Sequence, residues 1–225
     1  MPGTLLTTYP QKNGVTQKNG VTQAHLGYRL FLKESLRTIR VTASVCPSSR
    51  FLTTAMLDAV DFRNVRTLVE LGSGTGVITQ EILRRMMPDA RLFALEINLN
   101  FVEHLRASWR DRRLTVLHAD ASDLLSQLHI HGAGSVHAVV SSLGLTGMTA
   151  EQRARIVQQV EACLVPAGIM TQFQYLTSMA AVPNLPSLQI HRFQERRFLR
   201  NYFHSVSEKR VLLNLPPAVV FTCRK

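Results

Sequence analysis

The chain has 225 residues, 45% hydrophobic and 18% charged, a composition that predicts a globular domain with a full core and excludes a disordered or collagen-like chain. Its 26 lysines and arginines against 15 aspartates and glutamates give a net charge of +11, so we expect anionic partners: nucleic acid, an anionic membrane surface or acidic ligands. There is no apolar run of about 18 residues, no secretory signal, and no zinc-site or disulfide spacing among Cys46, Cys163 and Cys223, which predicts a cytoplasmic protein without a spanning helix.

Residues 1–23 are expected to form a flexible tail. They contain the sequence KNGVTQ at 12–17 and again at 18–23, with an Asn-Gly turn signal in each copy and no apolar periodicity. Two short copies do not make a solenoid, which needs at least about three larger units.

Residues 24–46 are predicted to hold a basic amphipathic helix over 26–40. One arc carries Tyr28, Phe31, Leu32, Leu36 and Ile39, and another carries Arg29, Lys33, Arg37 and Arg40. Two interpretations stay open. The helix either packs its apolar face on the core, or lies on an anionic bilayer, where each Lys or Arg adds roughly 1 kcal/mol.

The remaining residues, 47–225, are predicted to form one α/β domain. A helix capped by Ser48 or Ser49 is followed by alternating strands (67–71, 91–96, 114–118, 136–141 and 169–176) and helices (77–86, 100–108 and 149–162). This alternation indicates a doubly wound, mostly parallel sheet. Strands 204–212 and 218–222 are joined by too few residues for a crossover helix, so they form a hairpin and the last of seven strands is reversed.

A glycine-rich turn is the strongest local signal. Val69-Glu70-Leu71-Gly72-Ser73-Gly74-Thr75-Gly76 stands between a strand and a helix, where glycines let the backbone approach a ligand closely. A dinucleotide site fits this turn as well, so the surrounding residues have to decide. Glu70 precedes the glycines, Glu96 ends the next strand with a carboxylate placed for ribose hydroxyls, and His118-Ala119-Asp120-Ala121 follows the third strand, facing the adenine edge.

Together, Glu70, Gly72, Gly74, Gly76, Glu96 and Asp120 resemble the class I S-adenosylmethionine-dependent methyltransferases, over roughly residues 67–223. The resemblance implies S-adenosylmethionine as cofactor, its methionine part on the 72–76 turn, its ribose on Glu96 and its adenine by Asp120 and Ala121. The candidate cofactor-binding residues are Ser48, Glu70, Gly72, Ser73, Gly74, Gly76, Glu96, Ile97, Asn98, Asp120, Ala121 and Ser141.

Segments outside the glycine turn indicate which methyltransferase family the chain resembles. FLK at 31–33, ASVCPSSR at 43–50, VVSSLGL at 139–145, QFQY at 172–175 and NLPPA at 214–218 are similar to the bacterial phospholipid N-methyltransferases. That family implies methylation of the amine of phosphatidylethanolamine by a peripheral membrane protein. The partners expected from this are a phospholipid headgroup and, through helix 26–40, an anionic membrane surface.

The segment after the fourth strand distinguishes possible acceptors. Related rRNA adenine dimethyltransferases have an Asn-Leu-Pro-Tyr type motif there, which positions a flipped base. This chain has Ser141-Ser142-Leu143-Gly144, without a side-chain amide or an aromatic ring, which makes nucleic acid a less favoured partner. Gly144 also departs from the proline common in the lipid family. Three alternatives remain: an RNA methyltransferase, a small-molecule methyltransferase, and an inactive cofactor-binding regulator or membrane adaptor.

Several residues have two interpretations. Tyr175 is a candidate catalytic and substrate residue that accommodates a cationic product by cation–π contact, or an ordinary core tyrosine. Asn214 either faces the lipid headgroup or holds the turn before two prolines, and Ser48 and Ser49 either line the cofactor pocket or only cap a helix. The arginines at 192, 196, 197 and 200 form a solvated face or bind phosphates. The histidines show no ligand spacing, so no metal is predicted.

Overall fold

The structure is a computed structural model that describes residues 49–176 and 194–225. The predicted tail at 1–23, the predicted basic helix at 26–40, Ser48 and Arg192 lie outside the described residues. All described residues belong to one compact unit, 40–225.

The described part is built on a seven-stranded sheet with strand order β3-β2-β1-β4-β5-β7-β6. The strands are β1 (Thr67–Leu71), β2 (Arg91–Glu96), β3 (Leu114–His118), β4 (Val136–Ser141), β5 (Leu164–Tyr175), β6 (Ser205–Val211) and β7 (Ala218–Arg224). β7 pairs antiparallel with both neighbours, and the pairs among β1 to β5 are parallel. The carboxyl ends of β1, β2, β3, β4 and β5 therefore meet at one edge of the sheet, where ligands of open α/β sheets bind.

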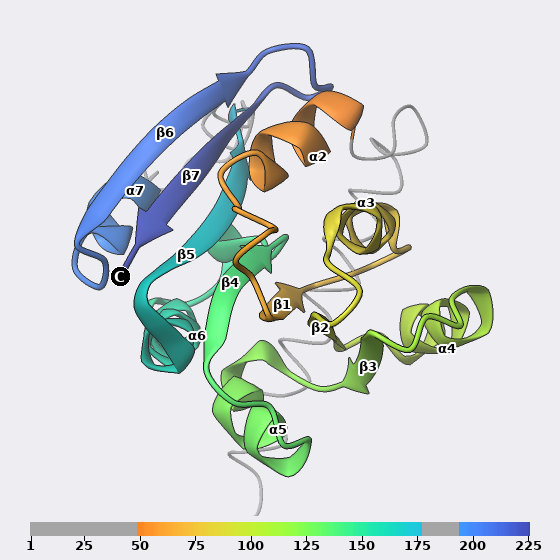
Figure 1. Ribbon diagram of the computed structural model, residues 1–225. Helices are drawn as coiled ribbons and strands as arrows, with labels where there is room; N and C mark the ends of the chain where they lie inside the picture. The colour runs from red at the N-terminus through yellow and green to blue at the C-terminus, as the bar shows by residue number, and fades with distance from the viewer. Residues whose placement is uncertain (1–48, 177–193) are drawn as a thin grey trace, which may run out of the picture. The chain divides into compact units, whose positions relative to one another are not determined.

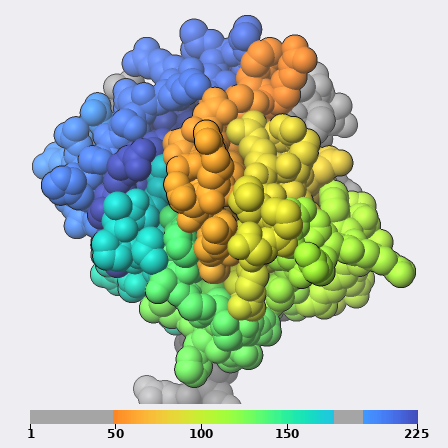
Figure 2. Space-filling model, viewed as in Figure 1, coloured from red at the N-terminus to blue at the C-terminus, as the bar shows by residue number. Residues whose placement is uncertain are grey.

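Helices cover both faces of the sheet, as Figure 1 shows, with α2, α3 and α4 on one face and α5, α6 and α7 on the other. Their bounds are α2 (Arg50–Leu57), α3 (Val77–Arg85), α4 (Leu99–Ser108), α5 (Leu124–Ile130), α6 (Ala150–Cys163) and α7 (Glu195–Leu199), with short 3-10 turns η1 (Ala121–Asp123) and η2 (Leu145–Gly147). In Figure 2, α2 and α3 lie side by side, and the hairpin region of β6 and β7 meets the start of α2.

Because the inner strands are buried on both faces, most of their residues are apolar. β1 is buried at every position, and the apolar residues of one sheet face pack with those of α2 and α3 in one cluster, among them Leu52, Met56, Ile82, Leu68 and Val140. Glu70 is the exception among these residues, since its carboxyl group is fully buried one residue before the end of β1. A charged residue at such a position is rare unless it is paired, which draws attention to the end of this strand.

The predicted fold class is confirmed, and most predicted elements agree with the observed ones within one or two residues. Two short helices, α5 and α7, were not predicted. β5 begins at Leu164 rather than 169, because the chain continues in the sheet through Ala167 with a register shift against β4. Among the described residues, no helix is long and apolar enough to cross a membrane.

Candidate functional site

The turn between β1 and α3 has a backbone that only glycines adopt readily. Gly72, Gly74 and Gly76 have φ angles of +75°, +52° and +86°. A Cβ on Gly76 would lie 2.5 Å from the ring of Trp109, whereas a Cβ on Gly74 would have no atom within 4 Å. The turn is thus packed against the protein at Gly76 and open at Gly74, which leaves its backbone accessible to a ligand.

Glu96 links this turn to the next strand. Its carboxylate accepts a hydrogen bond from the Gly74 N–H (2.9 Å, Oε2) and another from the Asn98 N–H (2.8 Å, Oε1). The side chain is 6% exposed, and the Asn98 side chain caps α4 by accepting from the Asn100 N–H. The structure thus brings the predicted residues Gly74, Glu96 and Asn98 into one hydrogen-bonded group.

Glu70 lies in β1, two residues before the first glycine of the same turn. The Thr79 hydroxyl donates to its Oε2 at 2.6 Å, and its Oε1 has no partner among the described residues. Burial raises the pKa of Glu70 to about 7; the Thr79 hydrogen bond opposes this shift, and the nearby charge of Glu96 adds to it. The site therefore holds a buried carboxyl group that titrates near neutral pH.

The end of β3 joins the group through backbone contacts. The Ala119 N–H donates to the Glu96 carbonyl (3.1 Å), and the His118 Nε2 lies 3.1 Å from the Ile97 carbonyl. The Asp120 carboxylate accepts from the Ser122 N–H at 2.8 Å, and Ala121 is buried. Asp120 and Ala121 thus lie at the same sheet edge as the glycine turn, as the spacing predicts.

The ends of β4 and β5 place further polar groups at this edge. Leu71, Ser141 and Gln172 are register partners across three strands, and the Ser142 N–H donates to the Leu71 carbonyl. The Ser141 hydroxyl accepts from the Leu143 N–H at 3.4 Å.

Some of these polar atoms have no partner. The hydroxyls of Ser73 and Ser142 and the Gln172 Oε1 are buried without a hydrogen-bond partner among the described residues. The Gln172 Nε2 donates to the Leu143 carbonyl at 2.7 Å, which holds this amide against the segment after β4. Buried polar groups without partners are uncommon in native proteins, so these three atoms are candidates for ligand contacts. Sequence reasoning did not select Ser142, Gln172 or Thr79 as site residues. Ser142 directly follows β4, which was an available signal, whereas Gln172 lies inside β5 and Thr79 in the first turn of α3.

Tyr175 ends β5 and is half-buried. Its ring packs edge-on against Phe173 with 5.1 Å between centroids, and burial raises its pKa. Tyr175 therefore lies at the sheet edge that carries the glycine turn. It is three residues further along β5 than Gln172 and pairs with Ala218 of β7.

Asn214 is buried in the loop between β6 and β7. Its Oδ1 accepts from the Ser49 hydroxyl (2.7 Å) and the Ser49 N–H (3.2 Å), and its Nδ2 donates to the Pro216 carbonyl (2.6 Å). Both ends of the amide are thus used between α2 and the β6–β7 loop. Ser49 also caps α2 by accepting from the Leu52 N–H. Among the predicted arginines, Arg196 lies 3.8 Å from Glu208 in an exposed ion pair. The described residues contain no group of three or more potential metal ligands.

Comparisons with known proteins agree with this arrangement. Residues 68–168 match the model of a family described as a methyltransferase domain. The chain is 32% identical over 196 residues to the ornithine lipid N-methyltransferase of Singulisphaera acidiphila, an alignment that covers 87% of this chain and 94% of that protein.

Solved structures share the fold at lower identity. The precorrin-6y C5,15-methyltransferase of Geobacter metallireducens is 18% identical with a TM-score of 0.60, over 82% of this chain and 93% of that one. The 1,6-didemethyltoxoflavin N1-methyltransferase of Burkholderia thailandensis, solved with S-adenosylhomocysteine, is 14% identical with a TM-score of 0.61, over 88% and 89%. With the glycine turn, the acidic strand end and the reversed β7 in place, the chain belongs to the class I S-adenosylmethionine-dependent methyltransferases, and S-adenosylmethionine is its cofactor.

Proposed function

We propose that this enzyme methylates the amine nitrogen of a membrane-lipid headgroup. The observation that carries the proposal is the similarity to a lipid N-methyltransferase along nearly the full length of both chains. Two headgroups have specific support. The relative's name favours an ornithine lipid, and the resemblance of segments such as QFQY at 172–175 favours phosphatidylethanolamine. Both offer a primary amine on an otherwise anionic or zwitterionic lipid.

The cofactor fits the group built around the glycine turn. The Glu96 carboxylate, which already accepts two N–H groups, has the acceptor capacity to receive ribose hydroxyls. The open backbone at Gly74 leaves room for the methionine part, and the unpartnered Ser73 hydroxyl adds a polar contact there. Asp120 and Ala121 border the adenine. These assignments are supported by the hydrogen-bonded arrangement of the three strand ends.

The acceptor amine is proposed to bind at the ends of β4 and β5. Gln172 Oε1 and the Ser142 hydroxyl are buried acceptors without partners among residues 49–176 and 194–225, and the Gln172 Nε2 contact to Leu143 holds the amide in place. A neutral amine has N–H groups to donate to these oxygens, which would aim its lone pair away from them. Tyr175, at the end of β5, offers its ring to the cationic product.

When bound, S-adenosylmethionine supplies a methyl group activated by its sulfonium. The chain's residues then need to orient the two reactants and exclude water, which for well-placed reactants supplies up to about 7–11 kcal/mol. Gln172 and Ser142 would orient the amine as hydrogen-bond acceptors, but their oxygens are too weak as bases to take a proton from an ammonium group. The amine would therefore lose its proton to bulk water before it binds, and its neutral nitrogen would then face the methyl group that the cofactor supplies.

The test is transfer of labelled methyl groups from S-adenosylmethionine. Full-length protein receives, in separate reactions, vesicles with phosphatidylethanolamine, vesicles with ornithine lipid, and total RNA, each vesicle also containing an anionic lipid. We expect label in at least one lipid, and the ratio of the two lipid rates identifies the headgroup. Glu96→Ala, measured in parallel at a limiting concentration of S-adenosylmethionine, serves as the control with weakened cofactor binding. Label in RNA alone, or in neither class, would refute the lipid assignment.

A further inference from the structure

The loop that joins β6 to β7 presents leucines to solvent. Leu212, Leu213 and Leu215 are 67%, 73% and 61% exposed, and they stand within four consecutive residues. The polar residue among them, Asn214, is 4% exposed. This inverts the usual arrangement of a surface turn, in which polar side chains face water and apolar ones face the core. We call Leu212, Leu213 and Leu215 the leucine tip.

Hydrogen bonds hold the leucine tip in this inverted arrangement. The Asn214 amide accepts from the side chain and the backbone of Ser49 and donates to the Pro216 carbonyl. Ser49 is the N-cap of α2, so the loop is fastened to a helix that packs on the core. With Asn214 fixed inward by three bonds, its neighbours on either side are directed outward.

The leucine tip lies at the edge of the sheet that carries the cofactor site. Val211 at the end of β6, Ala218 at the start of β7 and Tyr175 at the end of β5 form one register row. β5 runs parallel to β4, whose Ser141 pairs with Leu71 directly before the glycine turn. The loop therefore extends beyond the carboxyl edge of the sheet, as the hairpin beside the start of α2 in Figure 1 illustrates.

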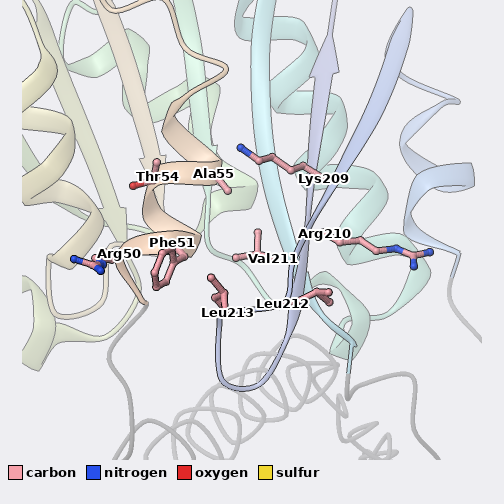
Figure 3. A pocket seen from close by; sticks show the side chains of 9 residues that line it. All are labelled: Arg50, Phe51, Thr54, Ala55, Lys209, Arg210, Val211, Leu212 and Leu213. Atoms are coloured by element: carbon pink, nitrogen blue, oxygen red, sulfur yellow. The ribbon is translucent and has the colours of Figure 1, made fainter.

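A groove of about 570 Å³ runs between the leucine tip and α2. Its lining includes Phe51, which is 40% exposed, together with Val211 and Leu213. Figure 3 shows Phe51, Val211 and Leu213 gathered around this space, with Arg50 and Arg210 on opposite sides of it. The Arg50 guanidinium lies over the Phe51 ring, 5.0 Å from its centroid, and that of Arg210 extends away from the groove. An apolar centre with cations on its flanks complements an anionic bilayer, whose phosphates lie above its acyl chains.

We propose that the leucine tip inserts into the interface of an anionic lipid bilayer and seats the active-site edge of the enzyme on the membrane. This rests on the proposed function, since a lipid headgroup has to reach the ends of β4 and β5. The tip is a docking surface separate from the predicted helix at 26–40. Insertion buries the three leucines and Phe51 in the acyl region while Arg50 and Arg210 meet lipid phosphates.

The experiment measures binding of the full chain to sedimented vesicles of phosphatidylcholine and phosphatidylglycerol. These vesicles contain no primary amine, so the result does not depend on which lipid is methylated. The test variant is Leu212→Asn/Leu213→Asn, which removes apolar surface without changing charge. The matched control is Leu125→Asn/Ile130→Asn on α5, since these leucine and isoleucine side chains are 41% and 66% exposed and their helix leads into the amino end of β4.

We expect the tip variant to bind vesicles at least about tenfold more weakly and the α5 variant to bind like wild type. Equal binding by all three proteins, or an equal loss in both variants, would overturn the proposal. A tip variant that binds vesicles normally but separates a dimer into monomers would also overturn it and assign the tip to a second copy of the chain. Cofactor affinity, measured by calorimetry on each variant, verifies that the fold is intact.

A second reaction separates this proposal from the function. A short-chain amine lipid that stays monomeric in water replaces the vesicles as methyl acceptor. If the function is right and the tip docks on membranes, the tip variant keeps its activity on the monomeric lipid and loses it on vesicles. A wild-type enzyme that methylates neither lipid form but binds vesicles through the tip would refute the function alone.

Discussion

Glu96 is the residue that joins the glycine turn to the start of α4. It accepts two backbone N–H groups from different elements, Gly74 in the turn and Asn98 before α4, and it is nearly buried. Charge-assisted hydrogen bonds of this kind contribute about 1.5–3 kcal/mol each. We predict that Glu96→Ala weakens S-adenosylmethionine binding by about 10- to 100-fold, measured by isothermal titration calorimetry.

The control for this prediction is Glu103→Ala, since Glu103 is exposed on α4, one helix away from the turn. It should bind the cofactor like wild type. Unchanged affinity of Glu96→Ala would remove the ribose assignment and leave Asp120 as the remaining acidic candidate at the sheet edge.

Glu70 makes the stability of the cofactor-free protein depend on pH. Its pKa rises from an ordinary 4.5 to about 7 on folding, so the folded state binds a proton more tightly than the unfolded state. Stability is then highest below about pH 4.5 for this group and falls as the pH rises from 4.5 to 7. We predict that Glu70→Gln, which mimics the protonated form, flattens this fall and raises the free energy of unfolding at pH 8 by about 2–3 kcal/mol.

Urea unfolding at a series of pH values measures this effect. A second buried carboxyl, Glu195, has a pKa raised to about 8 by burial, against the opposing charge of Arg153, and contributes a fall of the same sign. Glu195→Gln therefore serves as the comparison, because each variant should remove only its own part of the slope. A Glu70→Gln slope identical to that of wild type would show that Glu70 is not protonated in the folded protein.

At the scale of elements, the sequence predicted best where one period dominates a long enough run. The central strands were predictable because short segments of five or six residues, mostly apolar and bounded by turn signals, leave few alternatives. α5 was missed although Leu124 and Leu128 are buried with helical spacing, because a helix of seven residues offers only that one repeat. β5 was predicted too short because Pro166-Ala167-Gly168 has the composition of a turn, while in the sheet it forms an irregular continuation of the strand.

In the candidate site, too, some positions were predictable from the sequence and others were not. The location of the glycine turn, Glu96 and Asp120 at one sheet edge was predictable because each of them ends or follows a strand. The unpartnered oxygens of Ser142 and Gln172 were not, because only tertiary packing decides which polar atom at a strand end stays without a partner. Asn214 was assigned two roles from sequence, and its bonds to Ser49 depend on a contact across 165 residues that no local pattern encodes.

The glycine turn and α4 form a further unit whose packing can be tested. Gly76 has φ +86°, and an added Cβ would lie 2.5 Å from Trp109 and 2.6 Å from Leu105, both beyond the turn in the chain. We predict that Gly76→Ala lowers the free energy of unfolding by about 2–4 kcal/mol, through backbone strain and overpacking, and weakens cofactor binding with it. Thermal unfolding with and without S-adenosylmethionine measures both effects.

Gly134→Ala is the matched control, since a Cβ there has no atom within 4 Å and the backbone has no unfavourable φ. It should change the stability by less than about 0.5 kcal/mol in either direction. A Gly76→Ala protein as stable as this control would mean that Trp109 moves aside at little cost.

At the scale of the whole molecule, charge and apolar surface are distributed differently along the chain. Residues 1–48 contain six lysines and arginines against one glutamate, whereas the leucine tip is uncharged. If both segments bind the membrane, they do so through forces with different salt dependence. Salt screens exposed charges, with a Debye length of about 10 Å at 0.1 M and 3 Å at 1 M, while the burial of leucines is not weakened by it.

We therefore predict two separable losses of vesicle binding. Neutralising the predicted helix by Lys33→Gln/Arg37→Gln/Arg40→Gln should cost up to about 3 kcal/mol at low salt and little at 1 M salt, because its contribution is electrostatic. Leu212→Asn/Leu213→Asn should weaken binding by a similar factor at every salt concentration. Sedimentation with phosphatidylglycerol vesicles over a salt series distinguishes the two. If the charge variant loses as much vesicle binding at high salt as at low salt, the predicted helix binds through its apolar arc instead. If it loses no vesicle binding at low salt, residues 26–40 pack on the protein and the leucine tip alone meets the membrane.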